Sequence, residues 1–424
     1  MQPVPPPDML PVPLHLTGIG NGHLKISASP EAQQWFDQGL NLLHDFWDYE
    51  AARAFQQSIR VDPNCAICYW GLSRSVGNYH QSTNGYASKA LERAWELKSH
   101  AGKEERLIIE ATVAEENAHR DSESSGHNAK AESPGVALWR KAVDKDRDNP
   151  QPQIFLAESL LDGYDDKGEP HAGTKQAIAI LEAALKAHPD DSALNHYWIH
   201  AMEPSNHPER AIDAAKKLAS LAPNSGHMVH MPGHIFYRTG NYAEAEHWFT
   251  ASTAVDEAYM NSQHVSVDDT WNYVHNLMYS IDNLMQEGKF EEATTLSAKL
   301  AHARGQFAGT LYLGSPRDSM TRVNTLLPIA LRTGNWAQVQ KLLAGSNPDA
   351  KLENLLFLSG ELQQFAAGMQ AIESGDTATA KLASNALDAD LWRKSQAMKD
   401  EQAANHDQAK TEPHRRRAGV RLDD

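Results

Sequence analysis

The chain has 424 residues, of which 41% are hydrophobic and 22% are charged, and its formal net charge is −16. This composition is typical of a folded, water-soluble protein, and the acidic excess disfavours binding to the phosphate backbone of nucleic acids. The sequence contains no run of 18 apolar residues, so we expect no membrane span.

The N-terminal segment, residues 1–29, begins "MQPVPPPDML". It lacks the basic and then apolar pattern of a signal peptide, and its prolines predict an extended arm. Because a leader removed before a start methionine would leave the same sequence, the compartment stays open at this point.

Two amphipathic segments follow the arm, over residues 31–46 and 48–64. The first carries Trp35 and Gly39 four residues apart, and the second carries Ala51 and Phe55 four residues apart before a closing proline, Pro63. This spacing places each pair on one face of a helix, so the two segments predict a helical hairpin.

The chain has two cysteines, Cys65 and Cys68, which are too few for a disulfide framework or a four-cysteine zinc site. The favoured interpretation is two small, buried side chains on a helix. A redox pair and a surface disulfide are the alternatives, and the redox state is left open.

The second half of the hairpin pattern recurs along the chain with a period of 34 residues. Ala177, Ala211 and Ala245 are 34 residues apart, and so are the closing prolines Pro189 and Pro223. Fixed periods of this length are typical of solenoids, in which each helix pair buries its apolar face against the next pair.

These motifs resemble the tetratricopeptide repeat (TPR) family. The resemblance implies an all-α fold, a TPR-type right-handed α-solenoid of about seven to eight helical hairpins, strongly curled, over residues 30–390. The charged segment that follows, residues 391–424, lacks apolar periodicity and is expected to be a C-terminal tail.

Two neighbouring repeats carry matched pairs of histidines. His196 and His200 are four residues apart, and His230 and His234 repeat the pair 34 residues later. Residues at i and i+4 share one helix face, which is the spacing by which two imidazoles chelate a metal ion. Pro232, inside the second pair, is expected to bend its helix and aim the two rings at a common centre.

We therefore predict a transition-metal site for zinc, copper or iron, since clusters of imidazoles without thiolates suit these ions. Glu203 is the candidate catalytic residue or a group that orients a ligand. Nearby tyrosines are expected to line a pocket for a small molecule. The predicted ligands are His196, His200, His227, His230, His234 and His275, and the predicted pocket residues are Tyr197, Tyr237 and Tyr273.

A role without metal is the alternative, because duplication of a repeat also duplicates its histidines. The matched pairs would then form a structural polar network, or line a ligand-binding surface without metal. Weaker candidates for the site lie elsewhere in the chain: His23, His44, His80 and Glu158.

The stretches "NHYWIHAMEPS" and "GHMVHMPGHIFYRTGNYAEAE" are similar to one bacterial subfamily of TPR proteins, which carries a His-x3-His helix and a His-Met-Pro-x-His helix. Its members often have export signals, which implies a periplasmic or secreted location here, with the cytoplasm still open. The subfamily often has histidine where this chain has Asp48 and Met278. Asp48 is expected to substitute at the first position, and nothing substitutes at the second.

Three functions follow from these patterns. The favoured one is a metal-dependent enzyme acting on a small organic substrate, as a hydrolase or an oxidase. The second is a scaffold that binds a peptide or a partner protein, and the third is a metal carrier without catalysis. Whether the protein is an enzyme stays open.

Overall fold

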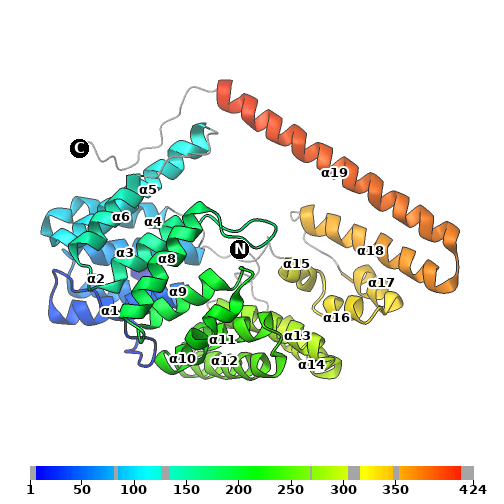
Figure 1. Ribbon diagram of the computed structural model, residues 1–424, viewed down its shortest axis with the longest axis horizontal. Coiled ribbons are helices and arrows are strands. Elements are labelled where there is room, and N and C mark those ends of the chain that lie inside the picture. Colours follow the sequence, from blue (N-terminus) through cyan, green and yellow to red (C-terminus); the bar gives the residue numbers. More distant parts are fainter. Residues whose placement is uncertain are drawn as a thin grey trace. The chain divides into compact units, whose positions relative to one another are not determined.

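The computed structural model describes residues 6–80, 85–125, 134–267, 270–303, 316–346 and 353–411. Across these residues the regular structure is helical, and the β-structure amounts to one isolated bridge between Tyr164 and Pro170. The predicted all-α fold of stacked helical hairpins is therefore confirmed (Figure 1). Within the described part of the chain, no helix combines the length and apolar character needed to cross a membrane.

The chain forms two compact units, the first ending at Tyr259 and the second beginning at Met260. In the first unit, consecutive helices pack against one another in chain order. Its elements are η1 (Pro7–Met9), α1 (Pro30–His44), α2 (Asp48–Val61), α3 (Ala66–His80), α4 (Tyr86–Glu96), η2 (Lys98–His100), α5 (Lys103–Ser125), α6 (Pro134–Lys145), α7 (Pro150–Leu160), α8 (Ala172–Ala187), α9 (Ser192–Met202), η3 (Pro208–Ala211), α10 (Ile212–Leu221), α11 (Gly226–Arg238) and α12 (Tyr242–Gln263), within which the unit ends.

Glycine and phenylalanine of the repeat motif explain how the hairpins close. A Cβ atom built on Gly39 of α1 would lie 2.8 Å from the Phe55 ring of α2, and one on Gly233 of α11 would lie 2.3 Å from the Phe249 ring of α12. Only glycine leaves room for the ring at this distance. The spacing in the sequence therefore reflects a phenylalanine ring that packs directly against a glycine in each of these two hairpins.

The N-terminal arm, residues 6–29, is bound along the first unit by side chains that pair with its backbone. Arg53 donates hydrogen bonds to the carbonyls of Pro11 and Val12. The Asn41 side chain both accepts from and donates to the backbone of Gly22. Four apolar side chains of the arm are buried: Leu10, Ile19, Leu24 and Ile26.

A short part of the arm, residues 17–22, reaches the starts of two later helices. The backbone N–H of Asn21 donates to the Ser192 hydroxyl at 3.2 Å. In return, the backbone N–H of Ser192 donates to the side-chain oxygen of Asn21 at 2.9 Å. Asn224, just before α11, donates its backbone N–H to the Gly18 carbonyl at 2.8 Å and its side-chain amide to the Thr17 carbonyl. The arm therefore ties the start of α9 to the start of α11.

The two cysteines are joined by a disulfide, and both are buried. Cys65 lies just before α3 and Cys68 lies in its first turn, with the Ser58 hydroxyl 3.0 Å from the Cys68 sulfur. The favoured expectation of two small buried side chains is right about their burial and wrong about their being unlinked. The spacing of three residues on a helix start brings the sulfurs together, which a count of cysteines does not reveal.

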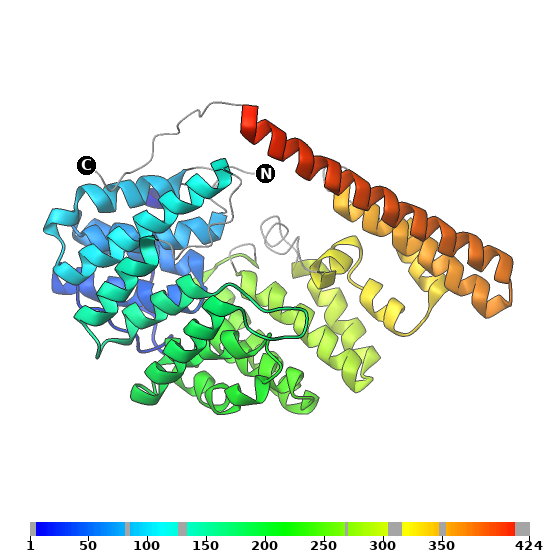
Figure 2. The same cartoon turned by 45° about the horizontal axis from the view of Figure 1, so that its top comes forward.

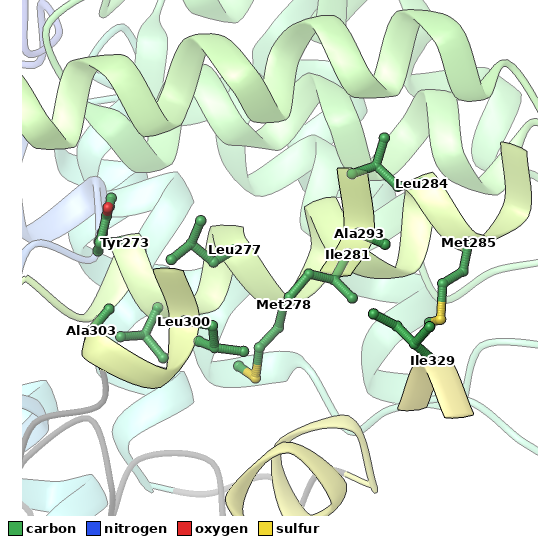
Figure 3. Close-up of a cluster of buried hydrophobic side chains, with 11 residues drawn as sticks. Tyr273, Leu277, Met278, Ile281, Leu284, Met285, Ala293, Leu300, Ala303 and Ile329 are labelled. Atoms are coloured by element: carbon green, nitrogen blue, oxygen red, sulfur yellow. The ribbon is translucent and has the colours of Figure 1, made fainter. Parts of the chain in front are cut away.

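The second unit has its own apolar cores. One core forms between α13 and α14 from Leu277, Met278, Ile281 and neighbouring side chains (Figure 3). A second core gathers around Leu327 and Val339. The helices are α13 (Trp271–Glu287), α14 (Phe290–Ala303), α15 (Pro316–Val323), α16 (Leu327–Arg332), α17 (Trp336–Ala344), α18 (Glu353–Ser374) and α19 (Thr377–Thr411). The last two form a long hairpin, drawn in orange and red in Figures 1 and 2.

The predicted C-terminal tail lies partly outside the described residues. Helix α19 extends past residue 391 to Thr411, and residues 412–424 are outside the described part of the chain. The domain boundaries predicted from the sequence stay a prediction.

Candidate metal centre

Helix α9 presents the first histidine pair. The Asp191 side chain accepts a hydrogen bond from the Leu194 amide and caps the start of the helix. His196 and His200 follow on one face, with ring centroids 4.7 Å apart. His196 is fully buried and His200 is partly buried. The cap and the i, i+4 spacing together determine where the two rings lie.

Helix α11 brings a third imidazole to this pair. The Ser225 side chain caps the helix, which continues through Pro232 as far as Arg238. The ring of His227 lies 5.0 Å from that of His196 and 5.8 Å from that of His200. One nitrogen from each of these three side chains lies within 4.8 Å of the other two, so the group could hold a metal ion.

A hydrogen bond at Nδ1 orients the His196 ring. Its Nδ1 lies 2.6 Å from the His44 carbonyl oxygen, which can only accept, so Nδ1 carries the proton. Its Nε2 is then left with a lone pair, and this atom is buried without a hydrogen-bond partner among the described residues, as is Nε2 of His200. A carbonyl that fixes one imidazole nitrogen while the other points at a shared centre is the arrangement found around metal ligands.

Phe46 covers the three imidazoles with an apolar ring. Its ring centroid lies 4.8 Å from His196, 5.2 Å from His200 and 5.5 Å from His227. Its φ is 55°, a left-handed conformation that bulky side chains rarely adopt. Strain of this kind persists only where the surrounding structure imposes it, and it gathers at functional sites.

The second pair on α11 adjoins the first group. The Nε2 atoms of His230 and His234 face each other at 2.7 Å, and both side chains are buried. Glu203, at the C-terminal end of α9, places a carboxylate oxygen 2.6 Å from Nδ1 of His234. The rings of His227 and His230 stack 5.8 Å apart. Five imidazoles from two helices therefore form one continuous array.

Burial determines the charge of this array. Burial lowers the pKa of His196 well below its ordinary value, and burial lowers the pKa of His200 to about 4. Burial alone would raise the pKa of Glu203, but the nearby His234 lowers it to about 2. His196 and His200 are therefore neutral at neutral pH, the state in which imidazole binds metal, while Glu203 is ionised.

The predicted pocket residues lie in different surroundings. Tyr197 is buried, and its ring lies 5.7 Å from that of His196. Tyr237 is half-buried and contacts Tyr242 edge-on. Tyr273 belongs to the apolar core of the second unit (Figure 3). Tyr197 therefore contacts the imidazole array.

The remaining candidates are also placed by their contacts. His275 lies on α13 of the second unit, between the rings of Trp271 and Tyr279. His44 is buried and bonds Gln151 through Nε2, so its contribution to the array is its carbonyl group. The side chain of His80 lies outside the described residues. His23 is exposed and pairs with Asp37, and Glu158 pairs with Arg74.

Two features of the site, Phe46 and the carbonyl of His44, were not predicted from the sequence. A backbone carbonyl has no signature in a sequence, because every residue carries one. A phenylalanine beside a helix end is also common, so only its φ and its ring contacts mark it.

Comparisons with known proteins add little to this picture. No family model matches the chain. No curated protein matches it. Among solved structures it is similar to the human IFIT1 dimer with m7Gppp-AAAA (14% identity, TM-score 0.41, covering 85% of this chain and 82% of that one). It is also similar to the human IFIT1 dimer with PPP-AAAA (12%, 0.39, 83% and 82%) and to the TPR domain of P58(IPK) (12%, 0.22, 88% and 99%).

TM-scores below 0.5 do not establish a shared fold with these proteins. The TPR-like description of the fold therefore rests on the antiparallel hairpins and on the glycine–phenylalanine contacts of the repeat motif.

Proposed function

We propose that the first unit binds a divalent transition metal through Nε2 of His196 and of His200, with His227 as the third ligand. The observation that carries the proposal is the pair of buried Nε2 atoms on α9, which face a third imidazole and have no hydrogen-bond partner among the described residues. Leaving buried polar atoms unsatisfied costs about 1–3 kcal/mol each, and a bound ion would recover that cost.

The proposed metal is zinc, copper or iron, and the proposed role is catalysis on a small organic substrate. Three protein ligands leave a coordination position for water or substrate, and a metal bound there would polarise it. Three side chains near the proposed metal would support the reaction. Phe46 would exclude water from one side, Tyr197 would contact the substrate, and Glu203 would orient the ring of His234.

We also propose a periplasmic or secreted location. The support is the buried Cys65–Cys68 disulfide, since disulfides persist in oxidising compartments. The subfamily resemblance points the same way.

A peptide- or protein-binding scaffold is the second candidate, and one observation favours it. Side chains on α1 and α2 already hold an extended backbone, that of the arm, through paired amide and guanidinium contacts. The same chemistry would serve a partner peptide on another hairpin. A metal carrier without catalysis is distinguished from the enzyme by turnover, not by binding.

The test is metal content and affinity in the full chain. The purified protein is stripped with chelator, dialysed against zinc, copper or iron(II), and analysed by elemental analysis and by calorimetric titration. The double variant His196→Gln/His200→Gln should lose the ion. The matched control is His207→Gln. His207 lies in the turn after α9, and its side chain is 66% exposed.

Circular dichroism would confirm that both variants keep their helices. Metal content near zero in the unaltered protein, or equal metal content in the double variant and the unaltered protein, would rule out this site.

A further inference from the structure

We infer that the first unit holds a second metal ion, bound by His230 and His234, beside the ion at His196, His200 and His227. The inference rests on the proposed function and adds to it a stoichiometry of two ions per chain. The ligand class is again a divalent transition metal, because both donors are imidazole nitrogens.

The geometry of the pair carries the inference. His230 and His234 lie four residues apart on α11, with ring planes 88° apart and ring centroids 4.5 Å apart. Their Nε2 atoms converge to 2.7 Å, so both rings direct the same nitrogen at one point. Imidazole nitrogens that bind one zinc ion lie about 2.0–2.1 Å from it, which brings neighbouring ligands to about 3 Å from each other.

Glu203 adds an independent observation. Its carboxylate oxygen lies 2.6 Å from Nδ1 of His234, and a carboxylate at this nitrogen favours the tautomer with the proton on Nδ1. This contact fixes the ring so that Nε2 of His234 offers its lone pair. A carboxylate bonded to the far nitrogen of a histidine also raises the basicity of the nitrogen that binds metal. Glu203 is thus a positioning residue for His234.

The position of the pair separates it from the first group. His230 follows His227 by three residues on α11, and their rings stack 5.8 Å apart. Each group has its own support at the far side of a ring: the His44 carbonyl for His196, and the Glu203 carboxylate for His234. From the first unit, the second ion has two imidazole ligands and the first ion has three, so the second ion should bind more weakly than the first.

The experiment counts ions per chain with zinc alone as the probe and repeats the count with copper(II), whose electron paramagnetic resonance reports each site. The unaltered protein should bind two ions of different affinity. His230→Gln/His234→Gln should retain the tighter ion and lose the weaker one, and His196→Gln/His200→Gln should do the reverse. His247→Gln, an exposed imidazole on α12, is the matched control and should bind two.

Glu203→Gln keeps both imidazoles and guards against a misfolded double variant. It should weaken the second ion about tenfold or more while leaving the affinity of the first unchanged. Should the unaltered protein bind one ion that is lost in His196→Gln/His200→Gln and kept in His230→Gln/His234→Gln, the second site would be excluded and the proposed function would stand. Loss of binding in neither double variant would overturn both.

Discussion

Phe46 shows how a single residue can be strained in order to cover a site. A left-handed backbone costs an ordinary residue about 1–2 kcal/mol, and here it turns the chain between α1 and α2 so that the ring lies on three imidazoles. The histidines themselves could be predicted from their spacing. The sign of φ at residue 46 could not, because it is set by what packs around the turn and not by local propensity.

The strain predicts an unusual order of stability between two variants. Phe46→Gly should be more stable than Phe46→Ala by about 1 kcal/mol, because glycine adopts positive φ without steric cost. Urea denaturation of the two proteins would measure the difference. At Ala183, an exposed position inside α8, the order should reverse, with Ala183→Gly losing about 1 kcal/mol. Equal stabilities of the two Phe46 variants would mean that the turn carries no such strain.

Among the elements, the N-terminal arm connects helix starts that lie far from it in the chain. Its prolines predict its extended form, but not its distant partners near the starts of α9 and α11, which lie about 170 to 207 residues away in the chain. Periodicity reports only contacts within a helix or between neighbouring repeats. The hairpins were therefore predictable from the sequence, and the tie between the starts of α9 and α11 was not.

The arm should matter for metal affinity as well as for stability. Gly20 has φ of 117°, and a Cβ atom there would lie 2.6 Å from the Asn41 side-chain oxygen and 2.7 Å from the Ser192 hydroxyl. Gly20→Ala should therefore displace the arm, destabilise the fold by about 1–3 kcal/mol and weaken metal binding, since α9 and α11 carry the ligands. Urea denaturation and calorimetric titration would measure the two effects.

Gly240→Ala is the control for the arm. Gly240 also has positive φ, 79°, but a Cβ atom at this position would meet no atom of the described residues within 4 Å. The variant should lose stability through backbone strain alone and keep its metal affinity. Equal metal affinities in the Gly20 and Gly240 variants would show that the arm does not position the ligands.

At the scale of the whole molecule, the buried imidazoles make stability depend on pH. The pKa of His200 is lowered to about 4 by burial, and that of His196 is lowered for the same reason. In the unfolded chain a histidine titrates near pH 6.5. Between about pH 6.5 and pH 4 the unfolded chain binds protons that the folded chain excludes, so stability is present above this window and is lost as the pH falls.

We expect the metal-free protein to lose about 2 kcal/mol of unfolding free energy at about pH 5 through His200 alone. Urea denaturation at about pH 7.5 and pH 5 would measure the loss, and His200→Gln should reduce it. An unfolding free energy that stays constant across this window in the unaltered protein would contradict the neutral, buried state of these rings.

The arm also has a consequence for how the protein is made. Residues 17–22 leave the ribosome well before Asn224, to which Thr17 bonds and which is 207 residues further along the chain. At about 5–20 residues per second, translation takes roughly ten to forty seconds to supply that partner. The arm can pair with α1 and α2 soon after they are made, through Asn41 and Arg53. Its contacts with Ser192 and Asn224 can form only after this delay, so the tie between α9 and α11 is completed late in synthesis.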